Sequence, residues 1–293
     1  METPFHQYTE YDPLLKVIVG RYQEYARDTA YVERINEDQK KGLPGVDQLR
    51  PEFDGLWHVL KDHGIEVLEP ANVGPFVYDQ LTPRDLGVAI GHRFLLCHMA
   101  PKSRRYEAAG IFRFLEHTPA GEPLVVIPDS PEIRIEGGDI LIDRERIWVG
   151  LSGRTNREGV EWMKRTFGDC FEVIEVPLKS PEEGEDVLHL DCTFNILDRK
   201  NAMIYPGGLR SIPAAILQGY ELTDVSREEQ QALATNFLPL SPDKILTRDH
   251  PHCKRVGGLL RNQGRQVIEI PFDAAPATGG SLRCCTLPLF RGR

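Results

Sequence analysis

Three short motifs carry residue types that could perform covalent chemistry. They are Glu-Gly-Gly-Asp at 136–139, His-Leu-Asp at 189–191 and Gly-Gly-Ser-Leu-Arg-Cys at 279–284. Together they offer a cysteine nucleophile, a histidine that can move protons and a carboxylate that can orient it, as a cysteine-dependent enzyme requires. The acid two residues after the histidine adds a second anion. Two anions around a thiol favour a cationic substrate, and a guanidinium group is the natural candidate.

The best nucleophile candidate is the cysteine nearest a glycine loop. Cys284 follows Gly279 and Gly280, and glycines allow the backbone to approach a ligand closely. A buried core cysteine is the alternative. Because side chains alternate across a strand, we expect Cys285 to face the core when Cys284 faces the site.

The histidine motif predicts two site residues. If residues 189–192 are extended, His189 and Asp191 share one face, and Leu190 and Cys192 point to the other. A histidine with a carboxylate on its own face is a good general acid–base candidate. A structural hydrogen-bonding histidine is the alternative.

Further acids could complete the site. Glu136 and Asp139 flank a glycine pair at the start of an expected strand, which indicates a bulge, a plain turn or a close ligand contact. Asp85 ends a Thr-Pro-Arg-Asp turn. Each of these signals is weak alone, and the prediction of a site is stronger because they occur together in one chain.

The segment 249–253, Asp-His-Pro-His-Cys, superficially resembles a metal cluster. It lacks a second pair of ligands at the spacing that zinc sites use. We therefore interpret it as the entrance to a helix, and we expect neither a metal nor a cofactor.

Composition indicates a soluble globular protein without a nucleic-acid or membrane partner. Hydrophobic residues make up 41% of the 293 residues, and the formal net charge is −9, opposite to the basic surface that nucleic acid favours. No apolar run approaches the roughly 20 residues that cross a bilayer, and no signal peptide is evident. Six scattered cysteines suggest no disulfide framework. We expect a cytoplasmic location, and a homo-oligomer is left open.

Strand-like and helix-like segments alternate along the whole chain. A strand pair, a helix and a further strand recur about every fifty residues, within the ~20–50-residue range of structural repeats. No linker divides the chain, so we predict one α/β domain over residues 1–293, with a polar surface excursion at 34–55. The expected helices are 50–63, 103–116, 157–167, 212–218 and 252–262, and Ser226 caps a stretch that runs to Phe237. The expected strands are 14–19, 65–68, 86–99, 124–127, 171–176, 221–225, 244–246, 267–270 and 281–289, with two strands each in 140–151 and 188–205.

In this order, the motifs resemble those of the guanidino-group-modifying enzymes of the pentein superfamily: arginine deiminases, dimethylarginine dimethylaminohydrolases and amidinotransferases. Residues 11–20 are similar to the opening strand of the amidinotransferases, and 82–85 to a guanidinium-binding aspartate motif. Residues 136–139 with 150–156 are closer to the hydrolases, and 189–195 to the amidinotransferases and deiminases. The resemblance implies a five-bladed α/β-propeller of ββαβ units around a central site.

The resemblance also implies roles for individual residues. Cys284 would be the nucleophile, His189 the general acid and base, and Glu136 the carboxylate of the site. Asp85 and Asp191 would hold the guanidinium group between them.

Arginines could bind the other end of a substrate. Arg104, Arg105 and Arg154 could each clamp a carboxylate through two hydrogen bonds, or could be solvated at the surface. In the dimethylarginine hydrolases two matching positions hold the substrate carboxylate. Arg104 or Arg105 matches one of these positions, and Arg154 matches the other. Asp139 is expected to contact the substrate as well.

The chain departs from every branch of the superfamily. It lacks the large helical insertion of the deiminases, Asp191 is not what the dimethylarginine hydrolases carry, and Arg283 stands where deiminases and amidinotransferases have histidine. The hydrolase-like residues lie in substrate-facing loops. We therefore predict hydrolysis of a C–N bond in arginine or a related small guanidino compound, through an amidino-cysteine intermediate. An amidinotransferase is the alternative, and a pentein that only binds its ligand is a third hypothesis.

Overall fold

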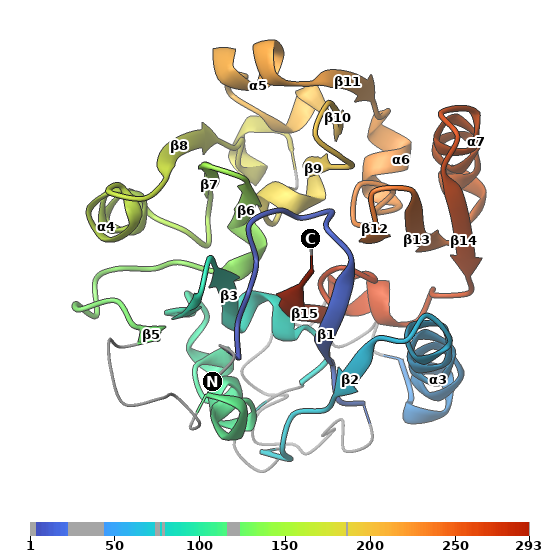
Figure 1. The fold of residues 1–293 in the computed structure, drawn as a ribbon, viewed down its shortest axis with the longest axis horizontal. Coiled ribbons are helices and arrows are strands. Elements are labelled where there is room, and N and C mark those ends of the chain that lie inside the picture. The colour runs from blue at the N-terminus through green and yellow to red at the C-terminus, as the bar shows by residue number, and fades with distance from the viewer. Residues whose placement is uncertain are drawn as a thin grey trace.

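Five sheets of three strands each form the described part of the protein. The computed structural model describes residues 4–22, 44–73, 77, 80–115, 124–185 and 187–292. The sheets surround a common centre and the larger helices lie outside them (Figure 1). In each sheet the middle strand pairs antiparallel on one side and parallel on the other. This arrangement confirms the expected five-bladed α/β fold.

The blades follow one another along the chain, apart from the first, which uses both ends. The first sheet contains β1 (Leu14–Val19), β2 (Glu66–Leu68) and β15 (Thr286–Arg291). The other sheets are β3 (Gly87–Ile90), β4 (Arg93–Leu96) and β5 (Val125–Val126); β6 (Ile140–Asp143), β7 (Arg146–Leu151) and β8 (Glu172–Pro177); β9 (Phe194–Ile196), β10 (Asn201–Ile204) and β11 (Glu221–Asp224); and β12 (Leu238–Ser241), β13 (Lys244–Arg248) and β14 (Gln266–Ile270). The helices are α3 (Val46–Asp62), α4 (Arg157–Phe167), α5 (Ala214–Gly219), α6 (Arg227–Gln231) and α7 (Lys254–Asn262).

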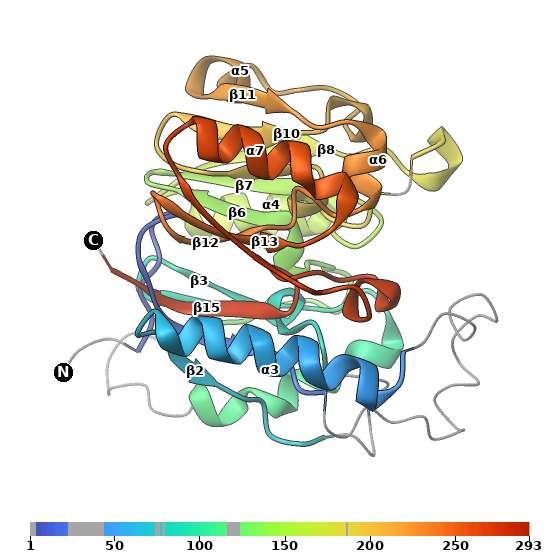
Figure 2. The ribbon, with the colours of Figure 1, turned by 90° about the vertical axis from the view of Figure 1, so that its right-hand side faces the viewer.

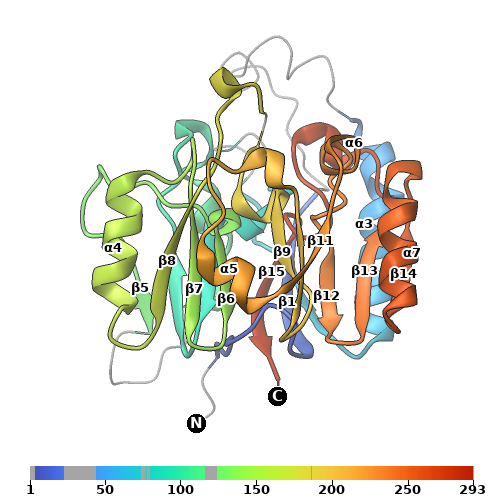
Figure 3. The ribbon, with the colours of Figure 1, turned by 90° about the horizontal axis from the view of Figure 1, so that it is seen from above.

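Helices provide the crossovers that the parallel pairs need, because consecutive parallel strands begin at the same edge of a sheet. In the third blade, α4 connects β7 to β8. Asn156 caps α4 by accepting a hydrogen bond from the N–H of Gly159 at 3.0 Å, and Val160 and Met163 on its inner face are fully buried. The helices α3, α4 and α7 lie on the outer side of their sheets (Figures 2 and 3). None of the described helices is long and apolar enough to cross a membrane.

The two ends of the chain close the ring. Strand β15 pairs antiparallel with β1, where Val19 lies opposite Thr286. In the first blade, β15 therefore occupies the position next to the middle strand that β3, β6, β9 and β12 occupy in the other blades. This pairing fixes Cys284, two residues before β15, relative to the opening strand.

Hydrophobic clusters fill the space between neighbouring sheets. One of them joins Val88 and Leu95 of the second blade to Ile140 and Val149 of the third, and all four side chains are fully buried. Such burial stabilises by about 25 cal/mol per Å² of apolar surface. The blades therefore hold one another in place and fix the loops at their ends.

Several predicted elements differ from the observed ones, and the segment expected as one strand at 86–99 forms the two strands β3 and β4. The helix expected at 103–116 is a series of short 3₁₀ segments over 102–104, 107–110 and 112–114, and residue 116 lies outside the described residues. The carbonyl oxygen of Gly110 accepts from the N–H of Ala71 at 2.7 Å, so this backbone serves a tertiary contact rather than a regular helix. Of the predicted excursion 34–55, residues 34–43 lie outside the described part and α3 begins at Val46.

The C-terminal strand is shorter at its start than expected, and one strand was not predicted. Residues 282–285 form a turn and the strand begins at Thr286, so strand alternation cannot separate Cys284 from Cys285. Cys285 nevertheless packs in a hydrophobic cluster. The sequence also gave no indication of β12.

Candidate active site

The candidate catalytic side chains stand just before the innermost strands of four blades. Asp85 precedes β3, Asp139 precedes β6, Asp191 precedes β9 and Cys284 precedes β15. The 3₁₀ turns that carry the first three contact one another. Residues separated by as many as 199 positions in the sequence therefore meet at the centre of the ring.

His189 is surrounded by acids. Its Nε2 lies 2.8 Å from Oε2 of Glu136, and its Nδ1 lies 3.7 Å from Oδ1 of Asp85. Burial lowers the pKa of His189, but Asp85, the hydrogen bond to Glu136 and the charge of Asp139 outweigh burial and raise this pKa to about 10. The imidazolium form is therefore present at neutral pH and can act as an acid.

The glycine pair of the Glu-Gly-Gly-Asp motif is explained by this close packing. A Cβ atom on Gly138 would lie 2.7 Å from the His189 ring and 2.9 Å from Oδ1 of Asp85. One on Gly137 would lie 2.1 Å from the carbonyl oxygen of Arg84. A larger residue at Gly138 would therefore displace His189 or Asp85, and one at Gly137 would displace the backbone at Arg84.

Glu136 connects the histidine to an arginine at the edge of the site. Its Oε1 accepts from the N–H of Ala100 at 2.9 Å, and its Oε2 lies 3.4 Å from Nη1 of Arg154. The side chain of Arg154 is 25% exposed, and within the described part of the chain its guanidinium has no other partner. Arg154 therefore keeps donors for an anion.

Both carboxylate oxygens of Asp139 contact protein groups. Its Oδ1 accepts from the N–H of Leu190 at 2.9 Å and its Oδ2 from the hydroxyl of Ser152 at 2.7 Å. Burial raises the pKa of Asp139 to about 6, although His189 and these hydrogen bonds oppose the rise. Asp139 fixes the backbone next to His189, and its expected contact with the substrate stays a prediction.

An asparagine that the sequence did not single out holds the cysteine. Nδ2 of Asn236 donates to Sγ of Cys284 at 3.2 Å, and its Oδ1 accepts from the N–H of Cys284 at 3.2 Å. Asn195 fixes the neighbouring backbone by donating to the carbonyl oxygens of Thr235 and Phe237. A donor directed at sulfur stabilises negative charge on it. The position of Asn236, two residues before β12, is the signal that could have identified it.

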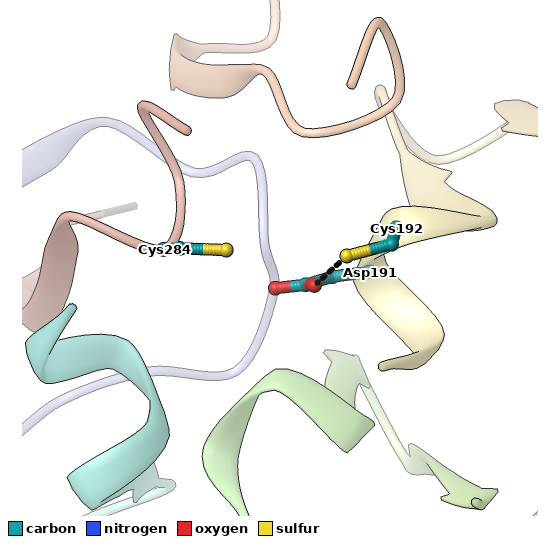
Figure 4. A group of neighbouring side chains, drawn as sticks. All are labelled: Asp191, Cys192 and Cys284. Atoms are coloured by element: carbon teal, nitrogen blue, oxygen red, sulfur yellow. Dashed lines mark hydrogen bonds between the residues drawn. The ribbon is translucent and has the colours of Figure 1, made fainter. Parts of the chain in front are cut away.

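Cys192 faces the site, contrary to the prediction. Residues 190–192 form a 3₁₀ turn and only His189 is extended, so the side chains do not alternate. Ligand atoms of Asp191, Cys192 and Cys284 lie within 4.8 Å of one another. In Figure 4, Cys284 points toward the other two across the centre.

An internal arginine holds Asp191 from behind. Arg283 donates from Nε to Oδ2 of Asp191 at 3.1 Å and from Nη2 to Oε2 of Glu10 at 2.7 Å. Burial raises the pKa of Asp191 and Arg283 opposes that rise. Glu10 also contacts Arg84; burial would raise the pKa of Glu10, but the surrounding arginines lower it to about 2. Arg283, next to Cys284, thus links the site to the N-terminal segment.

Arg104 and Arg105 lie in different surroundings. Arg104 donates to Oδ2 of Asp85 at 2.7 Å, to both carboxylate oxygens of Glu107 at 2.9 Å, and to Thr82. All three of its nitrogens are thus engaged, and Arg104 positions Asp85. Arg105 is exposed and lines a separate cavity of about 200 Å³. The clamp expected of either residue stays a prediction, and the contacts of Arg104 with Asp85 and Glu107 argue against it for Arg104.

Two buried atoms at the centre face each other without a partner. Oδ1 of Asp85 and Nδ1 of His189 have no hydrogen bond to any residue that the structure describes. Their separation of 3.7 Å is too long for a hydrogen bond. Buried polar atoms are rarely left unsatisfied, so a ligand that lies beside this pair and contacts both atoms would complete the hydrogen bonding.

The acids of the site are paired with cations. The acids are Asp85, Glu136, Asp139 and Asp191, and the cations are Arg104, Arg154, Arg283 and the His189 imidazolium. The motifs alone suggested an excess of anions. The observed pairing suits a substrate that carries both a cation and an anion.

Two trios of side chains have the donor set of a metal site. Ligand atoms of Asp85, Glu136 and His189 lie within 4.8 Å of one another, as do those of Asp191, Cys192 and Cys284. The segment 249–253 forms no such trio among the described residues. Its cysteine, Cys253, is buried in a hydrophobic cluster, which explains why it does not meet the neighbouring histidines.

Comparison with known proteins identifies the family. The model of the family described as "N,N dimethylarginine dimethylhydrolase, eukaryotic" matches residues 22–291. The chain belongs to this family, within the pentein superfamily. It is 32% identical to the uncharacterized protein YkgA of Bacillus subtilis, over 97% of this chain and 94% of YkgA. It is 26% identical to an arginine deiminase of Listeria innocua, over 74% of this chain and 64% of the deiminase.

Solved structures share the fold of this pentein. The amidinotransferase SxtG of Microseira wollei has a TM-score of 0.84 at 20% identity, over 98% of this chain and 97% of SxtG. DDAH of Pseudomonas aeruginosa, solved with citrulline, has a TM-score of 0.76 at 19% identity, over 94% and 99%. At these identities the likeness concerns the fold alone.

Proposed function

We propose that this pentein hydrolyses a C–N bond of the guanidinium group in arginine or a related small compound with an anionic tail. The observation that carries the proposal is the pair of unpartnered buried atoms, Oδ1 of Asp85 and Nδ1 of His189. A guanidinium N–H can donate to the first, and the second can serve the departing nitrogen. The family description, a dimethylarginine hydrolase, and the sequence likeness to an arginine deiminase support hydrolysis.

In the first step, Sγ of Cys284 attacks the central carbon of the guanidinium group. The C–N bond to the leaving amine breaks, and the imidazolium of His189 gives its proton to the departing nitrogen. Asp85 and Asp191 hold the remaining nitrogens, and Arg154 receives the anionic tail. The product of this step is an amidino-cysteine and a neutral imidazole.

In the second step, the neutral imidazole removes a proton from a water molecule, whose oxygen attacks the same carbon. The C–S bond then breaks as the second proton of the water is lost to solvent, releasing a ureido product and the thiolate. The raised pKa of His189, about 10, suits its return to the imidazolium form. Glu136 and Asp139 keep the histidine in position throughout.

An amidinotransferase would use the same residues and replace water with an acceptor amine. The fold similarity to SxtG keeps this reaction as the second candidate. No residue described at the centre distinguishes the two reactions, so the acceptor has to be identified by experiment.

The test is mass spectrometry of the protein with arginine, dimethylarginine and agmatine, with and without glycine or lysine as acceptor. A ureido product that is indifferent to the added amine supports hydrolysis, whereas a new guanidino compound formed only with an amine establishes the transferase. Cys284→Ser should abolish either product, and Cys170→Ser, which changes an exposed cysteine, should not. Turnover by Cys284→Ser would refute the covalent mechanism.

A further inference from the structure

A second, larger cavity lies at the other end of the strands. Its volume is about 730 Å³, within the roughly 300–1,000 Å³ of small-molecule sites. It is lined by the turn after β3, the turn after β6, the N-terminal segment around Tyr8 and the end of α4. The catalytic acids precede β3 and β6, and a four-residue strand spans about 13 Å. The two sites share no lining residue.

Aromatic rings form one wall of this cavity. Tyr8 has its ring centroid 5.6 Å from that of His92 and 6.2 Å from that of Phe171. Gly91, next to His92, exchanges backbone hydrogen bonds with Gln7 at 2.7 and 3.0 Å. The wall is therefore held by main-chain pairing and offers ring faces to a planar ligand.

An arginine in a costly backbone conformation forms another part of the wall. Arg144 has φ of 58° in the two-residue turn between β6 and β7, where glycine or asparagine is usual. It persists because Asp143 accepts from its Nε at 3.0 Å and Nη2 at 2.7 Å. Tyr11 and Tyr220 also donate to Asp143, at 2.8 and 2.6 Å. Backbone strain that the surroundings enforce in this way is typical of ligand-binding positions.

Two arginines of the cavity keep unused donors. Nη1 of Arg144 and the whole guanidinium of Arg199, on the turn between β9 and β10, have no hydrogen-bond partner in the described part of the chain. The lining also contains two acids, Asp12 and Glu145. The cavity thus combines ring faces with available guanidinium donors, and such donors recognise phosphate and carboxylate groups.

We propose that this cavity binds a small aromatic anion, a planar ring that carries a phosphate or carboxylate group. The ring lies against Tyr8 and Phe171, and the anionic group is held by Arg144 and Arg199. The volume accommodates a ligand as large as a nucleoside monophosphate. The site is independent of the reaction proposed for Cys284.

The test is isothermal titration calorimetry of the full-length protein with AMP, phenyl phosphate, benzoate, adenosine and inorganic phosphate. At least one of the three aromatic anions, AMP, phenyl phosphate or benzoate, should bind with a Kd of about 1 mM or lower. Adenosine and inorganic phosphate should bind at least tenfold more weakly. No binding of any aromatic anion, or equally tight binding of inorganic phosphate, would overturn the proposal.

Variants locate the ligand. Arg144→Gly, which suits the positive φ, and Arg199→Gln, at an exposed position, should each weaken binding at least tenfold. Arg210→Gln removes an exposed arginine elsewhere and should leave the Kd unchanged, as should Cys284→Ser at the active site. Unchanged affinity in both cavity variants would overturn the proposal. A second copy of the chain that covers the cavity in solution, detected by sedimentation, would overturn it as well.

Discussion

Replacing Glu136 with glutamine should change the protonation of His189 in a measurable way. Glu136→Gln keeps the shape of the side chain and the acceptor for Ala100, but removes the charge 2.8 Å from Nε2 of the histidine. A hydrogen bond that involves a charged group contributes about 1.5–3 kcal/mol, and one pKa unit corresponds to about 1.4 kcal/mol. The pKa of His189, raised to about 10 in the native protein, should therefore fall by roughly one to two units.

Proton NMR of the histidine rings measures this shift without knowledge of the substrate. The protein has nine histidines, and a His189→Gln variant assigns the resonance. Glu229→Gln, which removes a carboxylate paired with Arg255 on the far side of the ring, is the matched control and should leave the titration unchanged. A native His189 that titrates near 6.5, or one unaffected by Glu136→Gln, would refute the reasoning about the acid form.

Three further predictions test the site. Asn236→Ala should lower kcat/KM by about 10–150-fold in steady-state kinetics, because it removes the hydrogen-bond donor to the sulfur of Cys284, worth about 1.5–3 kcal/mol. Asn262→Ala, at the exposed end of α7, is the control and should show no such loss. Arg154→Gln should raise KM for arginine much more than for agmatine, which lacks the carboxylate, and equal effects would place the anionic tail elsewhere. The pKa of Glu10 is lowered from 4.5 to about 2, so its contribution to stability is complete above pH 4.5 and is lost as the pH falls toward 2. Urea unfolding across that window should show a fall in the free energy of unfolding that includes about 3 kcal/mol from this residue.

Regular amphipathic elements could be predicted closely from the sequence. The expected boundaries of β1 and α4, 14–19 and 157–167, are those observed. Both segments combine a strong apolar pattern with clear ends, and Asn156 caps the helix in the usual way. The number of blades came from the resemblance, because a repeat of strands and helices does not by itself show that a ring closes.

The interior of the site could not be predicted, because short 3₁₀ turns decide where its side chains point. Three 3₁₀ residues turn Cys192 toward Cys284, whereas an extended chain would have turned it away. The ion pairs of the site could not be predicted either. Nothing in the local sequence indicates that Arg104 pairs with Asp85 or that Arg283 pairs with Asp191. Arg104 meets Asp85 between two loops of the second blade, and Arg283 meets Asp191 between the first and fourth blades.

The ring nevertheless provides a rule that sequence spacing lacked. Each blade places its chemistry in the few residues before its innermost strand, and Asn236 occupies before β12 the position that Asp85 and Cys284 occupy before β3 and β15. Five such segments converge whatever residues they carry, because the pairing of the strands behind them fixes the geometry. The strands thus fix where these five segments lie, and the residue types within the segments can vary without disturbing the blades.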